Sequence, residues 1–147
     1  MTVASRSRMV RASRDTVWAV LADFGAVAAW AEEVDHSCLL DQHAEAVGTA
    51  RRVQIGRDTL IETITRFDPP GVLAYDITGL PAFVAASNRW TLEPGISGGT
   101  FATLTSTVHV TRRLLRFAAE PAVARLMTGR SEALLAGLAT ASEGVAA

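Results

Sequence analysis

The chain of 147 residues contains no lysine, and all 14 of its basic residues are arginine. Schiff-base chemistry on a side-chain amine is therefore excluded, because only the N-terminal amine remains. Arginine in place of lysine, together with 26 alanines, indicates the codon usage of a high-GC bacterium and says nothing about function. The single cysteine, Cys38, excludes an internal disulfide and is typical of a reducing cytoplasm.

The sequence also has no long apolar run and almost no net charge. The longest apolar run extends only from Phe24 to Ala31, far short of the roughly 20 residues that span a bilayer. No charged and then apolar leader begins the chain. A net charge of -1 argues against binding nucleic acid through phosphate neutralisation. We therefore expect a cytoplasmic protein forming a single domain over residues 1–147, with no membrane segment and no nucleic-acid partner.

The first two-thirds of the chain begins with a strand and two short helices and continues as strands. Alternation over residues 3–12 predicts a strand, and Ser13 followed by Asp15 predicts the N-terminus of a helix. Asp23 predicts a second cap, with a second short helix reaching about Ala31. Further strands are expected over residues 34–40, 47–55, 59–68, 72–78, 84–92 and 100–110, with hairpin-length connections that favour antiparallel pairing.

The C-terminal third returns to helical spacing. Pro121 is typical of the first turn of a helix, and apolar residues then repeat at threes and fours as far as residues 142–144. Several strands followed by one segregated helix predict an α+β fold with an antiparallel sheet of six to seven strands.

Several short phrases occur in the order typical of one superfamily. They are Asp15-Thr16-Val17-Trp18, Asp23-Phe24 with Trp30, Val47-Gly48-Thr49-Ala50-Arg51, Glu62, Phe67-Asp68-Pro69-Pro70, Leu73-Ala74-Tyr75, Arg89-Trp90-Thr91-Leu92-Glu93-Pro94 and Gly98-Gly99-Thr100. Over nearly its whole length the chain resembles the START/Bet v 1-like (SRPBCC) superfamily, specifically its bacterial polyketide cyclase/dehydrase and lipid-transport group. The resemblance implies a helix-grip fold, in which a curved antiparallel sheet wraps a long C-terminal helix around a cavity. Because only 6% of the residues are aromatic, that cavity either collapses on alanine and valine or stays open for a ligand.

The resemblance implies which alternate residues of each strand face the cavity. The polar candidates are His36, Arg51, Glu62, Tyr75 and Asn88. The apolar candidates are Val34, Val53, Ile55, Leu60, Ile64, Ile77, Ala86, Trp90, Leu104, Met127 and Leu134.

Arg51 and Glu62 are the first pair with chemical potential. They lie on neighbouring strands, and counting back from the turn at residues 56–58 places them opposite each other. They are expected either to orient a polar ligand group or to form a cross-strand ion pair that satisfies two inward charges.

Tyr75 and Asn88 are the second pair. The phenol of Tyr75 is expected either to donate a hydrogen bond to a ligand carbonyl, as an aldol-type cyclisation requires, or to be a buried aromatic with one partner. Asn88 binds a ligand if its side chain points inward, and faces solvent if the parity is shifted by one residue.

The other motifs favour structural roles. His36, Cys38 and His43 with two nearby aspartates match no zinc spacing, so we expect no metal, core packing for Cys38 and exposure of His43. The glycine-rich stretch 95–99 precedes a strand and is expected to be a hairpin loop rather than a phosphate cradle. A basic cluster near the start of the last helix is expected to be a solvated face, with docking to an acidic partner or anionic lipid as the alternative. Its residues are Arg112, Arg113, Arg116, Arg125 and Arg130.

Three functions are consistent with these features. The first is a carrier or sensor of a small hydrophobic molecule, such as a lipid or polyketide-like compound. The second is a polyketide cyclase or dehydratase, in which Tyr75, Glu62 and Arg51 perform general acid–base catalysis. The third is an interaction module that docks through the basic cluster. No cofactor is expected in any of them, and the sequence leaves a homodimer open.

Overall fold

The computed structural model describes residues 1–41, 43–111 and 113–146, including their side chains except those of 113–127 and 146. The elements are β1 (Thr2–Val10), α1 (Arg14–Ala22), the 3-10 helix η1 (Phe24–Ala29), β2 (His36–Asp41), β3 (Ala50–Ile55), β4 (Asp58–Asp68), β5 (Val72–Thr78), β6 (Val84–Pro94), the 3-10 turn η2 (Ile96–Gly98), β7 (Thr100–Val110) and α2 (Arg113–Ala146). The predicted α+β order is confirmed.

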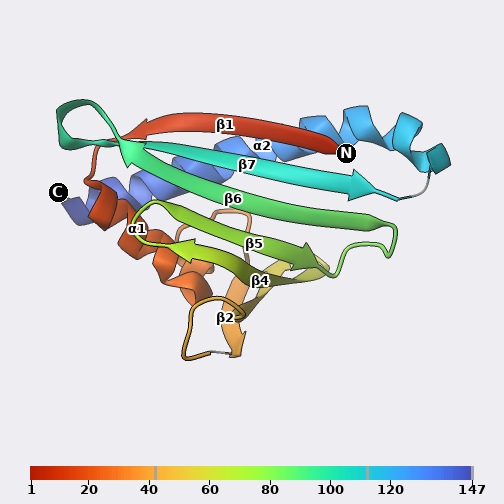
Figure 1. Cartoon of the computed structure of the whole chain (residues 1–147), viewed down its shortest axis with the longest axis horizontal. Coiled ribbons are helices and arrows are strands. Elements are labelled where there is room, and N and C mark those ends of the chain that lie inside the picture. Colours follow the sequence, from red (N-terminus) through yellow and green to blue (C-terminus); the bar gives the residue numbers. More distant parts are fainter. Residues whose placement is uncertain (42, 112, 147) are drawn as a thin grey trace.

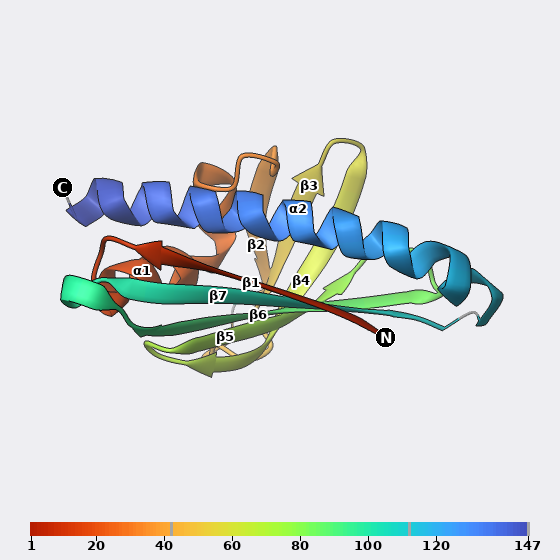
Figure 2. The ribbon, with the colours of Figure 1, turned by 90° about the horizontal axis from the view of Figure 1, so that it is seen from above.

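All seven strands form one curved antiparallel sheet in the order β1-β7-β6-β5-β4-β3-β2 (Figure 1). Consecutive strands from β2 to β7 are neighbours, and β1 closes the order by pairing with β7. α2 lies along one face of this sheet and packs against β1, β7 and α1 (Figure 2). This is the helix-grip arrangement that the resemblance implies.

The two short helices begin as the sequence predicts, with one difference. Ser13 caps α1, since its Oγ accepts a hydrogen bond from the backbone N–H of Thr16 at 3.3 Å, and Asp15 lies in the first turn. Asp23 precedes η1, but its side chain makes no capping hydrogen bond.

The long helix begins earlier than predicted. α2 starts at Arg113, so Pro121 lies inside the helix rather than in its first turn. An interior proline removes one backbone hydrogen bond and disfavours a helix, which is why the sequence points to a later start. Further along, Gly137 faces the backbone of Trp30 so closely that a Cβ atom would overlap the carbonyl oxygen of Trp30. The absence of a side chain at Gly137 therefore allows α2 to approach the segment after η1.

The core fills only part of the concave face of the sheet. Its larger cluster combines sheet residues such as Leu73, Trp90 and Leu104 with Trp18 of α1 and Leu138 of α2. These five side chains are at most 8% exposed. The other end of the concave face, beyond this cluster, carries the cavity described below.

Candidate functional site

A cavity of about 200 Å³ lies between the concave face of the sheet and α2. Described residues of five adjacent strands, of the segment before β2, of the β5–β6 connection and of α2 line it. They are Glu33, Val34, Val53, Ile55, Leu60, Glu62, Tyr75, Ile77, Leu80, Val84, Ala86, Ser87, Asn88, Ser106, Thr107, Val108, Arg130, Ser131 and Leu134. For comparison, an apolar cavity of about 150 Å³ binds benzene, so this one has room for a small organic molecule.

Five polar side chains cross the sheet and separate the filled core from this cavity. We call them the polar row, and they are Arg51 on β3, Glu62 on β4, Tyr75 on β5, Asn88 on β6 and Ser106 on β7. The strand register places Arg51 opposite Glu62, Tyr75 opposite Asn88, and Asn88 opposite Ser106.

Along each of the central strands the character of the inward face changes at this row. On β5, Leu73 is in the core, Tyr75 is in the row and Ile77 lines the cavity. On β7 the same order is Leu104 and Ser106, followed by Val108. The polar row is therefore the floor of the cavity, where the packed interior ends.

The hydrogen bonds of Tyr75 fix how its hydroxyl is used. The Oη atom accepts hydrogen bonds from Nε1 of Trp90 at 3.3 Å and from Nδ2 of Asn88 at 3.2 Å. Ser106 orients the amide of Asn88, because its Oγ donates to Oδ1 at 2.6 Å. An indole N–H can only donate, and a phenol oxygen has two acceptor sites. Both acceptor sites of Tyr75 are thus occupied, which leaves its own proton to donate elsewhere.

Burial keeps Tyr75 in its protonated form. Desolvation raises the pKa of the phenol above its ordinary value, and the negative charge of Glu62 raises it further. The positive charge of Arg51 and the hydrogen bonds from Asn88 and Trp90 act in the opposite direction but are smaller effects. Tyr75 is therefore a neutral hydrogen-bond donor at physiological pH, and it is no base.

Arg51 and Glu62 form the buried ion pair that the strand register predicts. Nε and Nη2 of Arg51 lie 2.8 and 2.7 Å from Oε1 of Glu62, and Nη1 donates to the carbonyl of Phe24 at 2.8 Å. The guanidinium also lies 3.8 Å from the ring centroid of Phe24 and 4.8 Å from that of Tyr75. Arg51 is thereby held by charge, by a backbone carbonyl and by two aromatic faces.

Oε1 of Glu62 takes both contacts from Arg51, so the second carboxylate oxygen stays free. Within the described part of the chain, Oε2 of Glu62 makes no hydrogen bond. The proton of Tyr75 likewise has no acceptor there. The polar row thus offers one donor and one anionic acceptor to whatever occupies the cavity.

Most of the predicted site residues lie in or beside this cavity. Val53, Glu62, Tyr75, Ile77, Asn88 and Leu134 line it. Arg51, at one end of the polar row, is not among the described lining residues, but it contacts Glu62, which is. Trp90 and Leu104 are among the buried residues of the core and are not among the described lining residues. The side chain of Met127 lies outside the described residues, as do those of Arg112, Arg113, Arg116 and Arg125.

His36 was expected to face the cavity and Cys38 to pack in the core, and both are instead exposed. The reason is that residues 31–34 form a turn, in which the N–H of Val34 donates to the carbonyl of Ala31, and β2 begins only at His36. The strand that follows therefore has the opposite parity, and a shift of one residue exchanges the faces of a strand. Ser37 points inward in their place, donating to the carbonyl of Gly25 at 2.8 Å and accepting from the N–H of Ala28 at 3.0 Å.

The remaining motifs have structural roles. His43 is exposed as predicted, with Nε2 3.2 Å from Oδ2 of Asp41. Residues 95–99 form the loop between β6 and β7, as predicted. Among the described residues, no three His, Cys, Asp or Glu side chains converge as metal ligands would. No helix in the described part of the chain is long and apolar enough to cross a bilayer.

Several lining residues carry no clear signal in the sequence. Ser106 has the inward parity of its strand but gave no signal of its own. Arg130 was assigned to a solvated face, and this is wrong, because its side chain lines the cavity from α2. Glu33, which lines the same cavity, lies in the segment after η1, where no periodicity indicates a direction.

Comparison of the whole chain with solved structures shows the same fold. A START superfamily protein from Mycobacterium smegmatis is similar with a TM-score of 0.82 and 18% identity, covering 97% of this chain and 98% of that one. The Zhui aromatase/cyclase from Streptomyces sp. R1128 has a TM-score of 0.80 and 21% identity, covering 97% and 93%. The XoxI protein from Bacillus cereus has a TM-score of 0.80 and 17% identity, covering 100% and 99%. At these identities the likeness shows the fold alone.

The sequence itself identifies the family. No curated protein matches the chain. A family model described as polyketide cyclase / dehydrase and lipid transport, however, matches residues 1–143. The match covers both walls of the cavity, from the polar row to α2. The chain is therefore a member of the polyketide cyclase/dehydrase and lipid-transport family.

Proposed function

We propose that this protein binds a small, mostly apolar molecule that carries a carbonyl group, and that it acts as a carrier or sensor of that molecule. The observation that carries the proposal is the hydroxyl of Tyr75, which lies at the floor of an otherwise largely apolar cavity. Because Trp90 and Asn88 occupy both of its acceptor sites, this hydroxyl can only donate. A ligand that fills the cavity without an acceptor would leave that donor buried and unpaired, which is unfavourable.

The apolar walls supply most of the expected affinity. Val53, Ile55, Leu60, Ile77 and Leu134 line the cavity around the polar row. Burying apolar surface contributes roughly 25 cal/mol per Å², whereas the hydrogen bond to Tyr75 adds orientation and selectivity. This division between many apolar contacts and a few oriented polar groups is typical of small-molecule sites.

The test is a comparison of two ligands that differ in one atom. 2-Acetylnaphthalene carries a carbonyl, and 2-isopropenylnaphthalene has a CH₂ group in place of the oxygen. Calorimetric titration is expected to show that the wild type prefers the ketone by about 2- to 10-fold, the value of one net hydrogen bond. Tyr75→Phe should abolish this preference and still bind the alkene with its wild-type affinity. If neither compound binds, or if Tyr75→Phe keeps the preference, the proposal is wrong.

A matched control separates the cavity from general effects on the sheet. Thr105 lies on the outer face of β7, where its hydroxyl pairs with that of Ser5 at 2.8 Å. Thr105→Val removes a hydroxyl from the same sheet without touching the cavity. The preference for the ketone is expected to be unchanged in this variant.

Catalysis is a second candidate, and the free Oε2 of Glu62 favours it. A carboxylate oxygen beside a phenol donor is the arrangement needed to remove a proton next to a carbonyl, as aldol-type cyclisation requires. In D₂O, an active site of this kind would exchange the methyl protons of bound 2-acetylnaphthalene for deuterium faster than buffer does. NMR measures this exchange directly. If Glu62→Gln and Tyr75→Phe exchange at the wild-type rate, these catalytic roles are excluded.

A further inference from the structure

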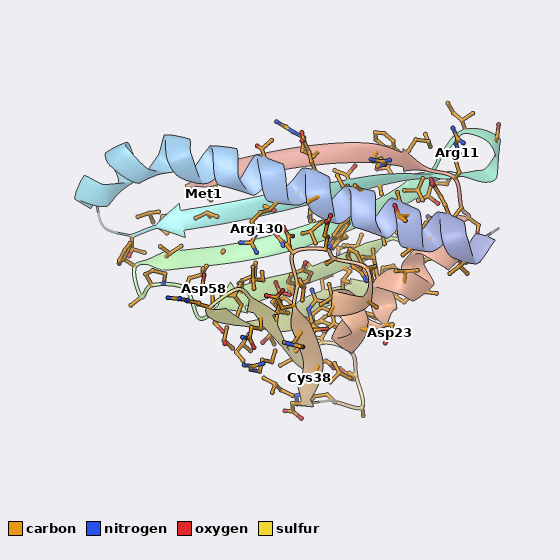
Figure 3. All side chains as sticks on the ribbon, turned by 180° about the vertical axis from the view of Figure 1, so that it is seen from behind. Met1, Arg11, Asp23, Cys38, Asp58 and Arg130 are labelled. Atoms are coloured by element: carbon orange, nitrogen blue, oxygen red, sulfur yellow. The ribbon has the colours of Figure 1, made fainter. Side chains whose placement is uncertain are left out.

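Arg130 is the feature of the cavity that the proposed function leaves unused. It projects from α2 into the space between the helix and the sheet (Figure 3), lines the cavity and is half-buried. Within the described part of the chain, its guanidinium makes no hydrogen bond and no ion pair. A guanidinium has five N–H donors and cannot lose its charge in a protein. Partial burial without an acceptor is therefore costly, and the group is suited to receive one from a ligand.

Glu33 is an acidic residue on which Arg130 acts electrostatically, and the two make no ion pair in the described part of the chain. Both side chains line the cavity. Burial raises the pKa of the Glu33 carboxyl, and the charge of Glu32 raises it further, while Arg130 lowers it. The two groups are thus close enough to interact electrostatically, yet they do not come within ion-pairing distance. A gap between opposite charges is left at the cavity wall.

We propose that Arg130 binds a carboxylate on the ligand, and this rests on the proposed function of the cavity. Tyr75 projects from the sheet and Arg130 from the helix, so one molecule that fills the cavity would meet a donor on each wall. The ligand class that follows is an amphipathic keto acid with an apolar centre, its carbonyl on Tyr75 and its carboxylate on Arg130.

A carboxylate fits this site better than a phosphate does. The planar guanidinium matches the two oxygens of a carboxylate with two parallel hydrogen bonds. Among the described lining residues Arg130 is the only basic side chain, so a single guanidinium would face the whole charge of a phosphate dianion. Glu33 would add a further negative charge beside it. A second negative charge on the ligand would therefore meet no basic partner on the described wall.

The experiment uses three naphthyl ketones and the full chain. 6-Acetyl-2-naphthoate carries the carboxylate, its methyl ester is the neutral match, and 2-acetylnaphthalene lacks the group. Calorimetric titration of the wild type is expected to show the acid binding at least about 10-fold more tightly than the ester, as a charge-assisted hydrogen bond requires. Arg130→Gln should bring the acid down to the affinity of the ester and leave the ester within about 2-fold of its wild-type value.

Two further variants complete the design. Glu33→Gln removes the competing negative charge, so it should strengthen binding of the acid and leave the ester unchanged. Arg89→Gln is the matched control, because Arg89 is exposed on β6 and is absent from the described cavity wall. It should leave the ratio of acid to ester affinity unchanged.

The outcomes separate the two proposals. If 2-acetylnaphthalene and the ester bind but the acid gains nothing, or if Arg130→Gln weakens acid and ester equally, the carboxylate site is wrong and the apolar cavity stands. If none of the three compounds binds, the proposed function fails and the carboxylate site fails with it. Retained binding of the ester by Arg130→Gln also shows that this variant is folded.

Discussion

The buried pair of Arg51 and Glu62 allows a quantitative prediction from its burial. The two side chains are 5% and 9% exposed, and Glu62 supplies the only counter-charge that Arg51 contacts in the described part of the chain. Removing one partner of a buried pair typically costs 3–5 kcal/mol, because an uncompensated charge remains. In Glu62→Gln the guanidinium keeps the carbonyl of Phe24 and the aromatic faces. We therefore expect a loss of about 2–4 kcal/mol in the free energy of unfolding.

Replacing both partners should cost less than replacing one. In Arg51→Met/Glu62→Leu no charge is buried, and the methionine sulfur can pack against the rings of Phe24 and Tyr75. Apolar replacements of buried pairs are commonly neutral or stabilising, so the double variant should be more stable than Glu62→Gln.

The assay is urea unfolding monitored by tryptophan fluorescence. The dependence of the free energy of unfolding on urea concentration should be the same in all variants, so that differences in midpoint report differences in stability. For a chain of this size, each kcal/mol shifts the melting temperature by about 2–4 °C. The exposed pair Arg66–Asp68 is the control. Its atoms approach to 2.6 Å, yet the side chains are 49% and 56% exposed, so Asp68→Asn should change stability by about 0.5 kcal/mol or less. A Glu62→Gln variant as stable as Asp68→Asn would refute the argument from burial.

Three further predictions follow from single contacts. Gly137→Ala should lower the free energy of unfolding by about 1–3 kcal/mol, because the new methyl overlaps the carbonyl of Trp30. Gly129→Ala in the same helix, where the new methyl meets no described atom within 4 Å, should raise it by up to about 1 kcal/mol. Equal effects of the two variants on urea unfolding would contradict the close approach of Gly137 to Trp30. Burial raises the pKa of Tyr75, so the unfolded chain releases this proton at a lower pH than the folded chain does. The free energy of unfolding should therefore fall as the pH rises above 10.0. Unfolding measured at several pH values should show no such loss of stability in Tyr75→Phe. Burial raises the pKa of Glu33 above its usual 4.5, so its contribution to stability is present below that pH and lost as the carboxyl ionises. Glu33→Gln should therefore stabilise the protein at neutral pH and not in acid, and a uniform gain would refute this.

What the sequence predicts correctly depends on local geometry. The register of Arg51 against Glu62 follows from a tight turn only a few residues away, and the strand parity of Tyr75 and Ile77 follows from their alternation. His36 was misplaced because the turn at residues 31–34 resets the parity, and its only signal was a short segment without periodicity. Such a turn is fixed by contacts with β3, including the hydrogen bond from the N–H of Asp35 to the carbonyl of Gln54 at 2.8 Å.

Residues that depend on how α2 lies across the sheet were beyond the sequence. Arg130 belongs to a helix with mixed faces, so its spacing alone does not tell whether it meets solvent or the sheet. Trp90 and Leu104 do share the inward face with Asn88, but α1 and α2 fill the interior beside them. Long-range packing determines where the packed core ends and the cavity begins, and no pattern along a single strand predicts this boundary.

The two walls of the cavity differ in how their polar groups are satisfied, and this difference assigns their roles. On the sheet, Ser106, Asn88 and Tyr75 form a chain of hydrogen bonds that fixes each group before a ligand arrives. Ordering these groups costs nothing at the moment of binding, so the floor can select a carbonyl by position. On the helix wall, Arg130 has no described partner, and a ligand would supply its first hydrogen bond. In the proposed function, the sheet therefore selects the carbonyl by position, and Arg130 adds a charge-assisted hydrogen bond to the affinity that the apolar walls supply.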